Sequence, residues 1–195
     1  MLNFYNKKAQ ILSEDIYLRS PSLIDYNKWS QIREKSRTFL TPWEPTWHIG
    51  EHSLRRYIRL LWIYSQRKRN NTQYSFFIFD KNHLLLGGIN VFNIKKGISQ
   101  SCTIGYWVGE NFSNKGYMTK ALSLLISCLF NQYNINRIEA ACLPDNIPSN
   151  KLLLRLGFTK EGYATDYLRI NGRWEDHILF GITKKKYDAD QRKDK

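Results

Sequence analysis

The segment Tyr106-Trp107-Val108-Gly109-Glu110-Asn111-Phe112-Ser113-Asn114-Lys115-Gly116-Tyr117-Met118-Thr119-Lys120-Ala121-Leu122 decides the fold of this chain. Its pattern predicts the end of a strand, a tight polar loop and the first turns of an amphipathic helix. The helix is predicted from apolar residues that recur every three or four positions: Met118, Ala121, Leu122, Leu125, Cys128 and Leu129. We expect this face to be buried against a core.

The loop before this helix has the features of an anion site. The first turn of a helix leaves backbone N–H groups without partners and carries partial positive charge. Gly116 has no Cβ, so it allows close approach of the backbone to a bulky anion, and Lys115 adds a full positive charge. The alternative is an ordinary strand-to-helix turn that contains a glycine.

A second pattern lies downstream. Asn146 is predicted to cap a helix, Pro148 suits its first turn, and Gly157 is expected to end it before a strand that begins at Phe158. Its apolar stripe consists of Leu152, Leu153 and Leu156.

Together these two segments resemble the GCN5-related N-acetyltransferase (GNAT) superfamily, whose acetyl-CoA site uses the order strand, pyrophosphate loop, helix, strand, Asn-x-x-Ser helix and Leu-Gly-Phe. Other segments are similar to the RimJ/RimL branch, the ribosomal-protein alanine N-acetyltransferases, and RimJ-type sequences are the closer of the two. These segments are Thr41-Pro42-Trp43-Glu44-Pro45, Glu161-Gly162-Tyr163-Ala164-Thr165-Asp166-Tyr167-Leu168 and Asn171-Gly172-Arg173-Trp174-Glu175-Asp176-His177. The resemblance extends over nearly all of the chain.

The resemblance implies an α+β (mixed α/β) fold. We expect a central, twisted, mostly antiparallel sheet of about seven strands, with the fourth and fifth strands splayed apart, flanked by about four helices. A length of 195 residues argues for a single domain over 1–195. Residues 184–195 are expected to form a polar, basic, frayed tail.

Two further helices are predicted before the sheet is complete. One begins near Ser22 and extends to about Phe39. The next extends from about Ser53 to Gln66, with Leu54, Ile58, Leu61 and Trp62 on one face.

The resemblance also implies acetyl-CoA as cosubstrate, with no metal. Pantetheine would pair with the backbone at Trp107 and Val108. The remaining cofactor-binding residues implied in this way are Ser113, Asn114, Lys115, Gly116, Tyr117, Met118, Thr119 and Asn146. Ser113 stands where the family has Gln or Arg and Asn114 where glycine is frequent, which leaves the affinity for CoA open.

The expected reaction is attack of a neutral amine on the thioester by direct transfer. An α-amino group has a pKa of about 7.7–8.0, so the neutral form costs only about 1 kcal/mol at pH 7, whereas a lysine side chain would cost about 4–5 kcal/mol. A weak base is therefore sufficient, and the candidate carboxylates are Glu44, Asp166 and Asp176.

By resemblance, Ser149 is the proton donor for the leaving thiolate. For Ser149 and Asn146 the alternative is a purely structural role in capping the helix. Residues expected to contact the acceptor are Trp43, Glu44, Tyr106 and Tyr167.

Charge indicates an anionic partner. Lys and Arg number 30 against 17 Asp and Glu, which gives a net charge of +13. The densest run is Arg55, Arg56, Arg59, Arg67, Lys68 and Arg69. We expect either a solvated helix face or a surface that docks on a ribosome or rRNA.

Other features limit the alternatives. Cys102, Cys128 and Cys142 fall on apolar faces and are expected to be core residues, and the absence of a signal-like or membrane-spanning run predicts a cytoplasmic protein. His48-Ile49-Gly50-Glu51-His52 matches a zinc-peptidase pattern, but Gly50 and Pro45 disfavour the continuous helix that the pattern requires. A small-amine (polyamine or antibiotic) acetyltransferase and a non-catalytic RNA- or ribosome-binding module remain as alternative functions.

Overall fold

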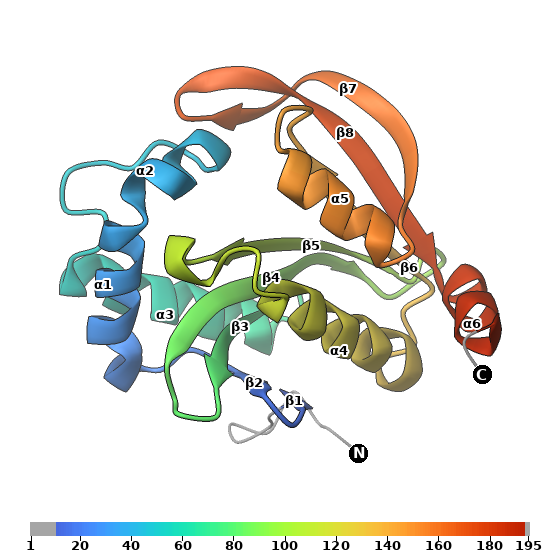
Figure 1. Ribbon diagram of the computed structural model, residues 1–195, viewed down its shortest axis with the longest axis horizontal. Coiled ribbons are helices and arrows are strands. Elements are labelled where there is room, and N and C mark those ends of the chain that lie inside the picture. The colour runs from blue at the N-terminus through green and yellow to red at the C-terminus, as the bar shows by residue number, and fades with distance from the viewer. Residues whose placement is uncertain (1–10, 194–195) are drawn as a thin grey trace.

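The sheet is built around a strand that is buried on both faces. In the computed structural model, which describes residues 11–193, strand β3 (Gln73–Asp80) is buried along almost its entire length. Because successive side chains of a strand point to opposite faces, Tyr74, Phe76 and Ile78 enter one core. Phe77 and Phe79 enter a second, smaller and more aromatic core. Helices therefore cover the sheet on both faces (Figure 1).

The eight strands form one mixed sheet. Besides β3 they are β1 (Ile11–Leu12), β2 (Ile16–Arg19), β4 (Leu85–Lys95), β5 (Ser101–Val108), β6 (Arg137–Cys142), β7 (Thr159–Ile170) and β8 (Arg173–Thr183). Their order is β1-β2-β3-β4-β5-β6-β8-β7, and every neighbouring pair is antiparallel except β5 and β6. The expected mixed, mostly antiparallel sheet is confirmed. The additional strand arises because the opening segment turns at Ser13, whose hydroxyl donates to the Ile16 carbonyl.

The helices pack in two groups. They are α1 (Tyr26–Lys35), α2 (Arg37–Leu40), α3 (Leu54–Arg69), α4 (Tyr117–Gln132), α5 (Ile147–Arg155) and α6 (Lys184–Lys193). Figure 1 shows α3 behind β3 and β4, while α4 and α5 lie in front of the sheet. Trp29 of α1 and Tyr57 of α3 belong to the smaller core, whereas α4 and α5 supply the larger one. Across residues 11–193, no helix combines the length and the apolar character that a bilayer crossing requires.

The first predicted helix is broken in two. α1 ends at Lys35 and α2 begins at Arg37, with Ser36 buried between them. The Ser36 hydroxyl accepts a hydrogen bond of 3.0 Å from the backbone N–H of Glu110, just after β5. The break thus fixes α1 and α2 to the loop that follows β5.

Most of the apolar face predicted for α3 is not buried. Leu54, Ile58 and Trp62 are 45%, 49% and 61% exposed, whereas Tyr57 is fully buried. Tyr57 packs on Trp29, and its hydroxyl donates to the Ser22 carbonyl at 2.8 Å. Tyr57 thus fills the aromatic core with its hydroxyl hydrogen-bonded, and of the predicted apolar face only Leu61 packs on this core, while the other three residues face outward.

The prediction of a frayed tail is also wrong up to Lys193. The segment forms α6, and the Tyr187 ring packs on Phe130 with centroids 5.1 Å apart. Lys184 also pairs with Asp188 at 2.8 Å. One aromatic anchor and a helix-spaced ion pair order a segment whose composition is otherwise polar.

Candidate functional site

A gap opens between the two parallel strands. β5 and β6 pair at residues 101–103 and 137–139, and no later pairs join them. On its other edge, β5 stays paired with β4 as far as Val108. Since alternate residues of a strand direct their backbone groups to opposite neighbours, every second residue of 104–108 presents its N–H and C=O groups to the gap. The splayed strands expected from the sequence are therefore present.

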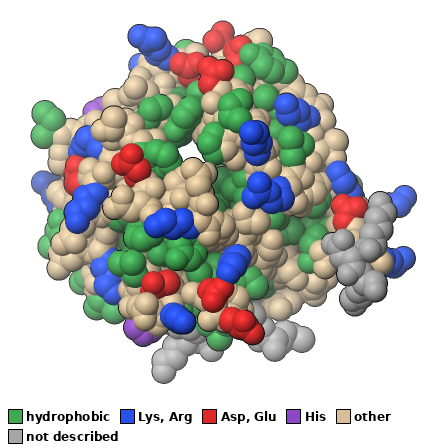
Figure 2. Space-filling view, in the orientation of Figure 1, with side chains coloured by type: hydrophobic (Ala, Val, Ile, Leu, Met, Phe, Trp, Pro, Cys, Tyr) green, Lys and Arg blue, Asp and Glu red, His purple; other side chains and the backbone are tan. Residues whose placement is uncertain are grey.

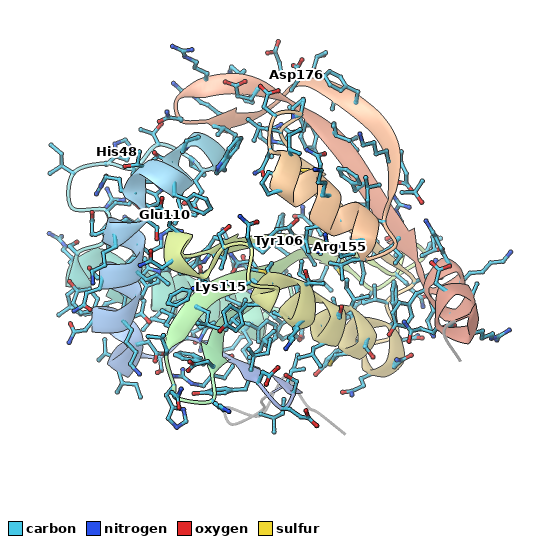
Figure 3. The ribbon with its side chains drawn as sticks, viewed as in Figure 1. His48, Tyr106, Glu110, Lys115, Arg155 and Asp176 are labelled. Atoms are coloured by element: carbon cyan, nitrogen blue, oxygen red, sulfur yellow. The ribbon has the colours of Figure 1, made fainter. Side chains whose placement is uncertain are left out.

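The loop at the end of β5 leads to an open helix N-terminus. Gly116 has a φ of +78° and directly precedes α4, and apart from its neighbours along the chain no described atom lies within 4 Å of the position of an added Cβ. Among residues 11–193 no side chain caps α4, and no acidic residue lies in its first turn. Lys115 is exposed beside Gly116 (Figure 3). The first-turn N–H groups are thus accessible to an anion.

The other residues predicted in this loop have distinct positions. Asn114 is exposed and has a left-handed φ of 59°, a conformation that asparagine tolerates well. Met118 is buried in the larger core, whereas Ser113 and Thr119 are half-buried. The Tyr117 ring contacts Phe112, with centroids 6.5 Å apart.

Two hydroxyl groups meet across the gap. The Tyr106 hydroxyl of β5 lies 2.8 Å from the Ser149 hydroxyl of α5. Burial raises the pKa of Tyr106 above its ordinary value, so the phenol stays protonated at neutral pH. The bond thus joins the two walls of the gap.

The start of α5 is fixed by two asparagines. The Asn146 side-chain oxygen accepts from the Ser149 backbone N–H at 3.1 Å, as expected of an N-cap. The Asn150 amide is buried and donates to the Leu143, Pro144 and Asn146 carbonyls. These contacts hold Ser149 at the mouth of the gap.

The second end of the site is covered by residues 41–47, here called the roof loop. Glu44 forms a bidentate ion pair with Arg33 of α1, and the Trp47 indole donates to the same carboxylate at 2.9 Å. The Glu44 carbonyl accepts from the Asn171 backbone N–H, so the β7–β8 hairpin closes on this loop. Figure 2 shows the surface hollowed between α2 and α5, with hydrophobic side chains around the opening.

Aromatic rings surround this ion pair. The Arg33 guanidinium lies 4.4 Å from the Trp47 ring centre and 4.9 Å from that of Trp107. Trp107 therefore packs on the smaller core, whereas Val108 packs on the larger core. Trp43 is half-buried in a 3₁₀ turn of the roof loop.

The two aspartates lie on the β7–β8 hairpin. Asp176 accepts from the Tyr163 hydroxyl at 2.7 Å and from the Asp166 backbone N–H at 2.9 Å. The first of these bonds is the main cause that lowers the pKa of Asp176. Figure 3 places Asp176 at the hairpin, well away from Tyr106. Tyr167 is exposed and its ring contacts His177. Asp166 and Asp176 are thus bonded to each other on the hairpin, and neither has a hydrogen bond to Ser149 in the described residues.

The histidine pattern does not form a metal site in this structure. His48 is exposed in a turn, whereas His52 is buried and bonded to Glu34 at 2.7 Å. In the described part of the chain, no three His, Cys, Asp or Glu side chains are grouped to hold a metal ion. Burial lowers the pKa of His52, which favours a neutral ring between Trp29 and Trp47.

The three cysteines lie in the larger core. Burial raises the pKa of Cys102 to about 12 and those of Cys128 and Cys142 to about 11. Their thiols are therefore protonated at neutral pH, which disfavours a covalent acyl-cysteine route.

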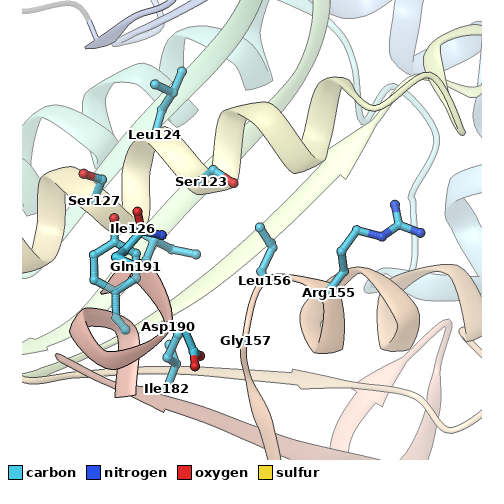
Figure 4. Close-up of a pocket in the computed structure, with 11 residues that line it drawn as sticks. Ser123, Leu124, Ile126, Ser127, Arg155, Leu156, Gly157, Ile182, Asp190 and Gln191 are labelled. Atoms are coloured by element: carbon cyan, nitrogen blue, oxygen red, sulfur yellow. The ribbon is translucent and has the colours of Figure 1, made fainter. Parts of the chain in front are cut away.

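A cavity of about 520 Å³ lies farther along the groove, between α4, the end of α5 and α6 (Figure 4). Its lining includes Ser123, Ser127, Arg155 and Asp190 but none of the residues predicted for the site. Because Tyr106 and Ser149 are not in its walls, we do not assign the reaction to this cavity.

Sequence reasoning missed three features of the site. Arg33 and Trp47 carried no motif, and the contact of Tyr106 with Ser149 spans 43 positions of sequence. Opposite charge and hydrogen-bonding capacity would have been the only sequence signals that pair Arg33 and Trp47 with the Glu44 carboxylate. The Tyr106 contact required the three-dimensional arrangement.

Comparisons with known proteins agree with this geometry. The model of the acetyltransferase (GNAT) domain matches residues 15–159. A ribosomal protein uS5-alanine N-acetyltransferase of Escherichia coli (strain K12) is 35% identical over 177 residues, which are 90% of this chain and 91% of that protein.

Two solved structures share the fold. The ribosomal-protein-S5-alanine acetyltransferase of Vibrio fischeri is 31% identical, has a TM-score of 0.83, and aligns over 91% of this chain and 98% of its own. RimJ of Mycobacterium smegmatis in complex with CoA-disulfide is 29% identical, with a TM-score of 0.82 and coverage of 91% and 90%.

Proposed function

Since this chain belongs to the GNAT family of acetyltransferases, we propose that it transfers acetyl from acetyl-CoA to the α-amino group of a protein N-terminus. We further propose that the acceptor is a ribosomal protein with an N-terminal alanine. Support comes from the relatives in Escherichia coli and Vibrio fischeri, whose names state that activity. Each of them aligns with about nine tenths of this chain. The observation that carries the proposal is the gap between β5 and β6, which ends at the open N-terminus of α4.

The residues at this gap fit a diphosphate-bearing thioester. The uncapped first turn of α4 and the space around Gly116 suit a phosphate group, and Lys115 adds a positive charge. The backbone of residues 104–108 offers hydrogen bonds to the amide groups of an extended chain such as pantetheine. When bound, acetyl-CoA supplies the activated acyl group and a thiolate as the leaving group.

Ser149 is proposed to supply the proton that the departing sulfur takes. Its hydroxyl lies at the gap and is positioned by the capping bond from Asn146 and by Tyr106. If Tyr106 donates to the Ser149 oxygen, the Ser149 proton is directed into the gap. The raised pKa of Tyr106 keeps that donor protonated.

The acceptor amine needs little help to lose its proton. At pH 7 the neutral form of an α-amine costs about 1 kcal/mol. Water or a distant carboxylate is therefore a sufficient base to accept its proton. The Glu44 carboxylate accepts from Arg33, and the Asp176 carboxylate accepts from Tyr163 and from the Asp166 backbone N–H, so both carboxylates already have partners within the fold. We therefore propose that Glu44 acts mainly by holding the roof loop and that the base is weak.

The acceptor would enter between the roof loop and the β7–β8 hairpin. The Glu44–Asn171 backbone bond joins these two walls, and Trp107 faces the same side. Trp43 and Tyr167 come from opposite walls and are proposed to contact the first residues of the peptide.

The basic run of α3 is proposed to assist docking on a ribosome. It begins at Arg55 and ends at Arg69, on the side of the sheet opposite α4. An excess of 13 positive charges also disfavours polycationic acceptors such as polyamines, because like charges repel at the site entrance.

Mass spectrometry of ribosomal proteins from a strain that lacks this protein tests the assignment. We expect one small-subunit or large-subunit protein to lose its N-terminal acetyl group, and a plasmid copy to restore it. Unchanged acetylation of every ribosomal protein would show that the substrate is another amine. Thiol release with a panel of small amines would then identify the alternative acceptor.

A further inference from the structure

The solvent-facing side of α3 combines exposed apolar and cationic side chains. We call it the α3 outer face, and it consists of Leu54, Arg55, Ile58, Arg59, Trp62 and Arg69, all of which are exposed. Trp62 is 61% exposed and lies near the middle of the helix. An exposed apolar patch that is flanked by charges is typical of an interaction site.

Three of the six cations in the basic run are either paired with another side chain or partly buried. Arg56 pairs with Glu51 at 3.2 Å, Arg67 donates to the Gln73 side chain at 2.6 Å, and Lys68 is half-buried. The other three, Arg55, Arg59 and Arg69, pair with no acidic side chain of residues 11–193. They all belong to the α3 outer face, so this face is positive without compensation.

From these observations we propose that the α3 outer face binds single-stranded RNA, with a base stacked on Trp62 and phosphates held by the three arginines. This inference rests on the proposed function, since it specifies which ligand the proposed docking surface of α3 binds. Aromatic rings that stack bases beside cations that contact phosphates are the usual means of binding single strands. Arg55 and Arg69 are about 21 Å apart along the helix axis, which accommodates several nucleotides.

Other occupants fit this face less well. A second copy of the chain, docked face to face, would bring two sets of three arginines together at a cost in repulsion. An acidic protein would satisfy the arginines but would not require an exposed indole ring among them.

Binding at this face leaves the reaction site accessible. α3 lies behind the sheet in Figure 1, whereas α4 and the loop at Gly116 lie in front. RNA on α3 and acetyl-CoA in the gap can therefore be bound together.

The test uses the full chain and a fluorescein-labelled oligouridine of about 12 nucleotides. Arg55→Gln/Arg59→Gln/Arg69→Gln is compared with Lys81→Gln/Lys96→Gln/Lys185→Gln, which removes the same charge from exposed positions elsewhere. We expect the α3 triple variant to bind roughly tenfold or more weakly and to reduce the salt dependence of log K by about 2, because single strands contribute about 0.7 per phosphate contact. The control triple should bind within about twofold of the unmodified chain.

Trp62 separates stacking from charge. Trp62→Leu keeps an apolar side chain without a ring face and should weaken binding by about fivefold to a hundredfold, the worth of one stacked base. Trp62→Phe should restore part of that loss. Equal binding by Trp62→Leu and the unmodified chain would overturn the proposal, as would equal losses in the two triple variants.

Two further readouts complete the test. Sedimentation that shows a dimer dissociated by Trp62→Leu would assign the face to a second copy and contradict RNA binding. Acetylation of a short N-terminal peptide should remain at the unmodified rate in the α3 variants. If the unmodified chain binds RNA but acetylates no peptide, the proposed function fails while the assignment of this face stands.

Discussion

The Tyr106 hydroxyl and the Ser149 hydroxyl are 2.8 Å apart and connect β5 to α5 where the sheet has lost its own pairing. Both groups can donate and accept, so the pair can fix the direction of a proton at the gap. In the proposed reaction, this pair would supply the proton that the departing thiolate takes.

The first prediction concerns this pair. Ser149→Ala should lower kcat about 10²-fold, and Tyr106→Phe about tenfold, because each removes a hydroxyl from one proton path. The KM for acetyl-CoA should change less than about threefold. In the double variant the losses should not multiply, since the two hydroxyls act as one unit.

Steady-state kinetics of the four proteins complete this double-mutant cycle. Thr at position 149 provides a control that retains the hydroxyl. Fully multiplicative losses would mean that Tyr106 supports the fold rather than Ser149.

The second prediction concerns the roof loop. Glu44→Gln removes the charge that pairs with Arg33 but keeps an oxygen that can accept from Trp47. If Glu44 positions the loop, KM for the peptide should rise about tenfold while kcat stays within about threefold. Asp188→Asn, which alters the ion pair with Lys184 in α6, is the control. A kcat that falls a hundredfold at unchanged KM would instead identify Glu44 as the base.

The third prediction concerns Gly116 and uses Gly50 as its match. Both glycines have left-handed φ values, +78° and +71°, and open space where a Cβ would lie. Alanine at either position should therefore cost about 1 kcal/mol, a shift of Tm by about 2–4 °C. Calorimetric titration with acetyl-CoA should show about tenfold or more loss of affinity for Gly116→Ala, through loss of a hydrogen bond to a charged group. Gly50→Ala should bind acetyl-CoA like the unmodified chain. Equal affinities of the two variants for acetyl-CoA would show that its phosphates do not bind at the Gly116 loop.

Much of this site follows from local sequence patterns. Gly116, Asn146 and Gly157 mark helix ends, and their positions in the structure agree with the patterns because capping depends on near neighbours. The parallel pair of splayed strands came from the family resemblance, since strand divergence leaves no periodic signal.

The errors share a physical cause. The face of α3 was assigned by counting Leu, Ile and Trp, but the sheet selects Tyr57, whose ring fills the aromatic core and whose hydroxyl finds Ser22. The order of α6 depends on the contact of Tyr187 with Phe130, which are 57 positions apart by their numbers. Such tertiary contacts override local propensity and composition.

The fourth prediction is the pH dependence of the reaction. With a peptide that offers only its α-amino group, kcat/KM should rise with pH, reach half of its maximum near pH 8 and level off above about pH 9, as the amine becomes neutral. Because burial raises the pKa of Tyr106, its phenol keeps its proton, so no decline should follow up to about pH 10. A decline between pH 8 and 10 that disappears in Tyr106→Phe would contradict this assignment of the phenol.

Acetyl transfer to two matched peptides tests the central claim most directly. The purified chain is incubated with acetyl-CoA and either a peptide with a free N-terminal alanine or the same peptide with a blocked N-terminus and a free lysine. Mass spectrometry should show one acetyl group on the α-amino nitrogen of the first peptide, with equal release of free thiol, and almost none on the second. Acetylation of the lysine alone, or no thiol release with either peptide, would contradict the account.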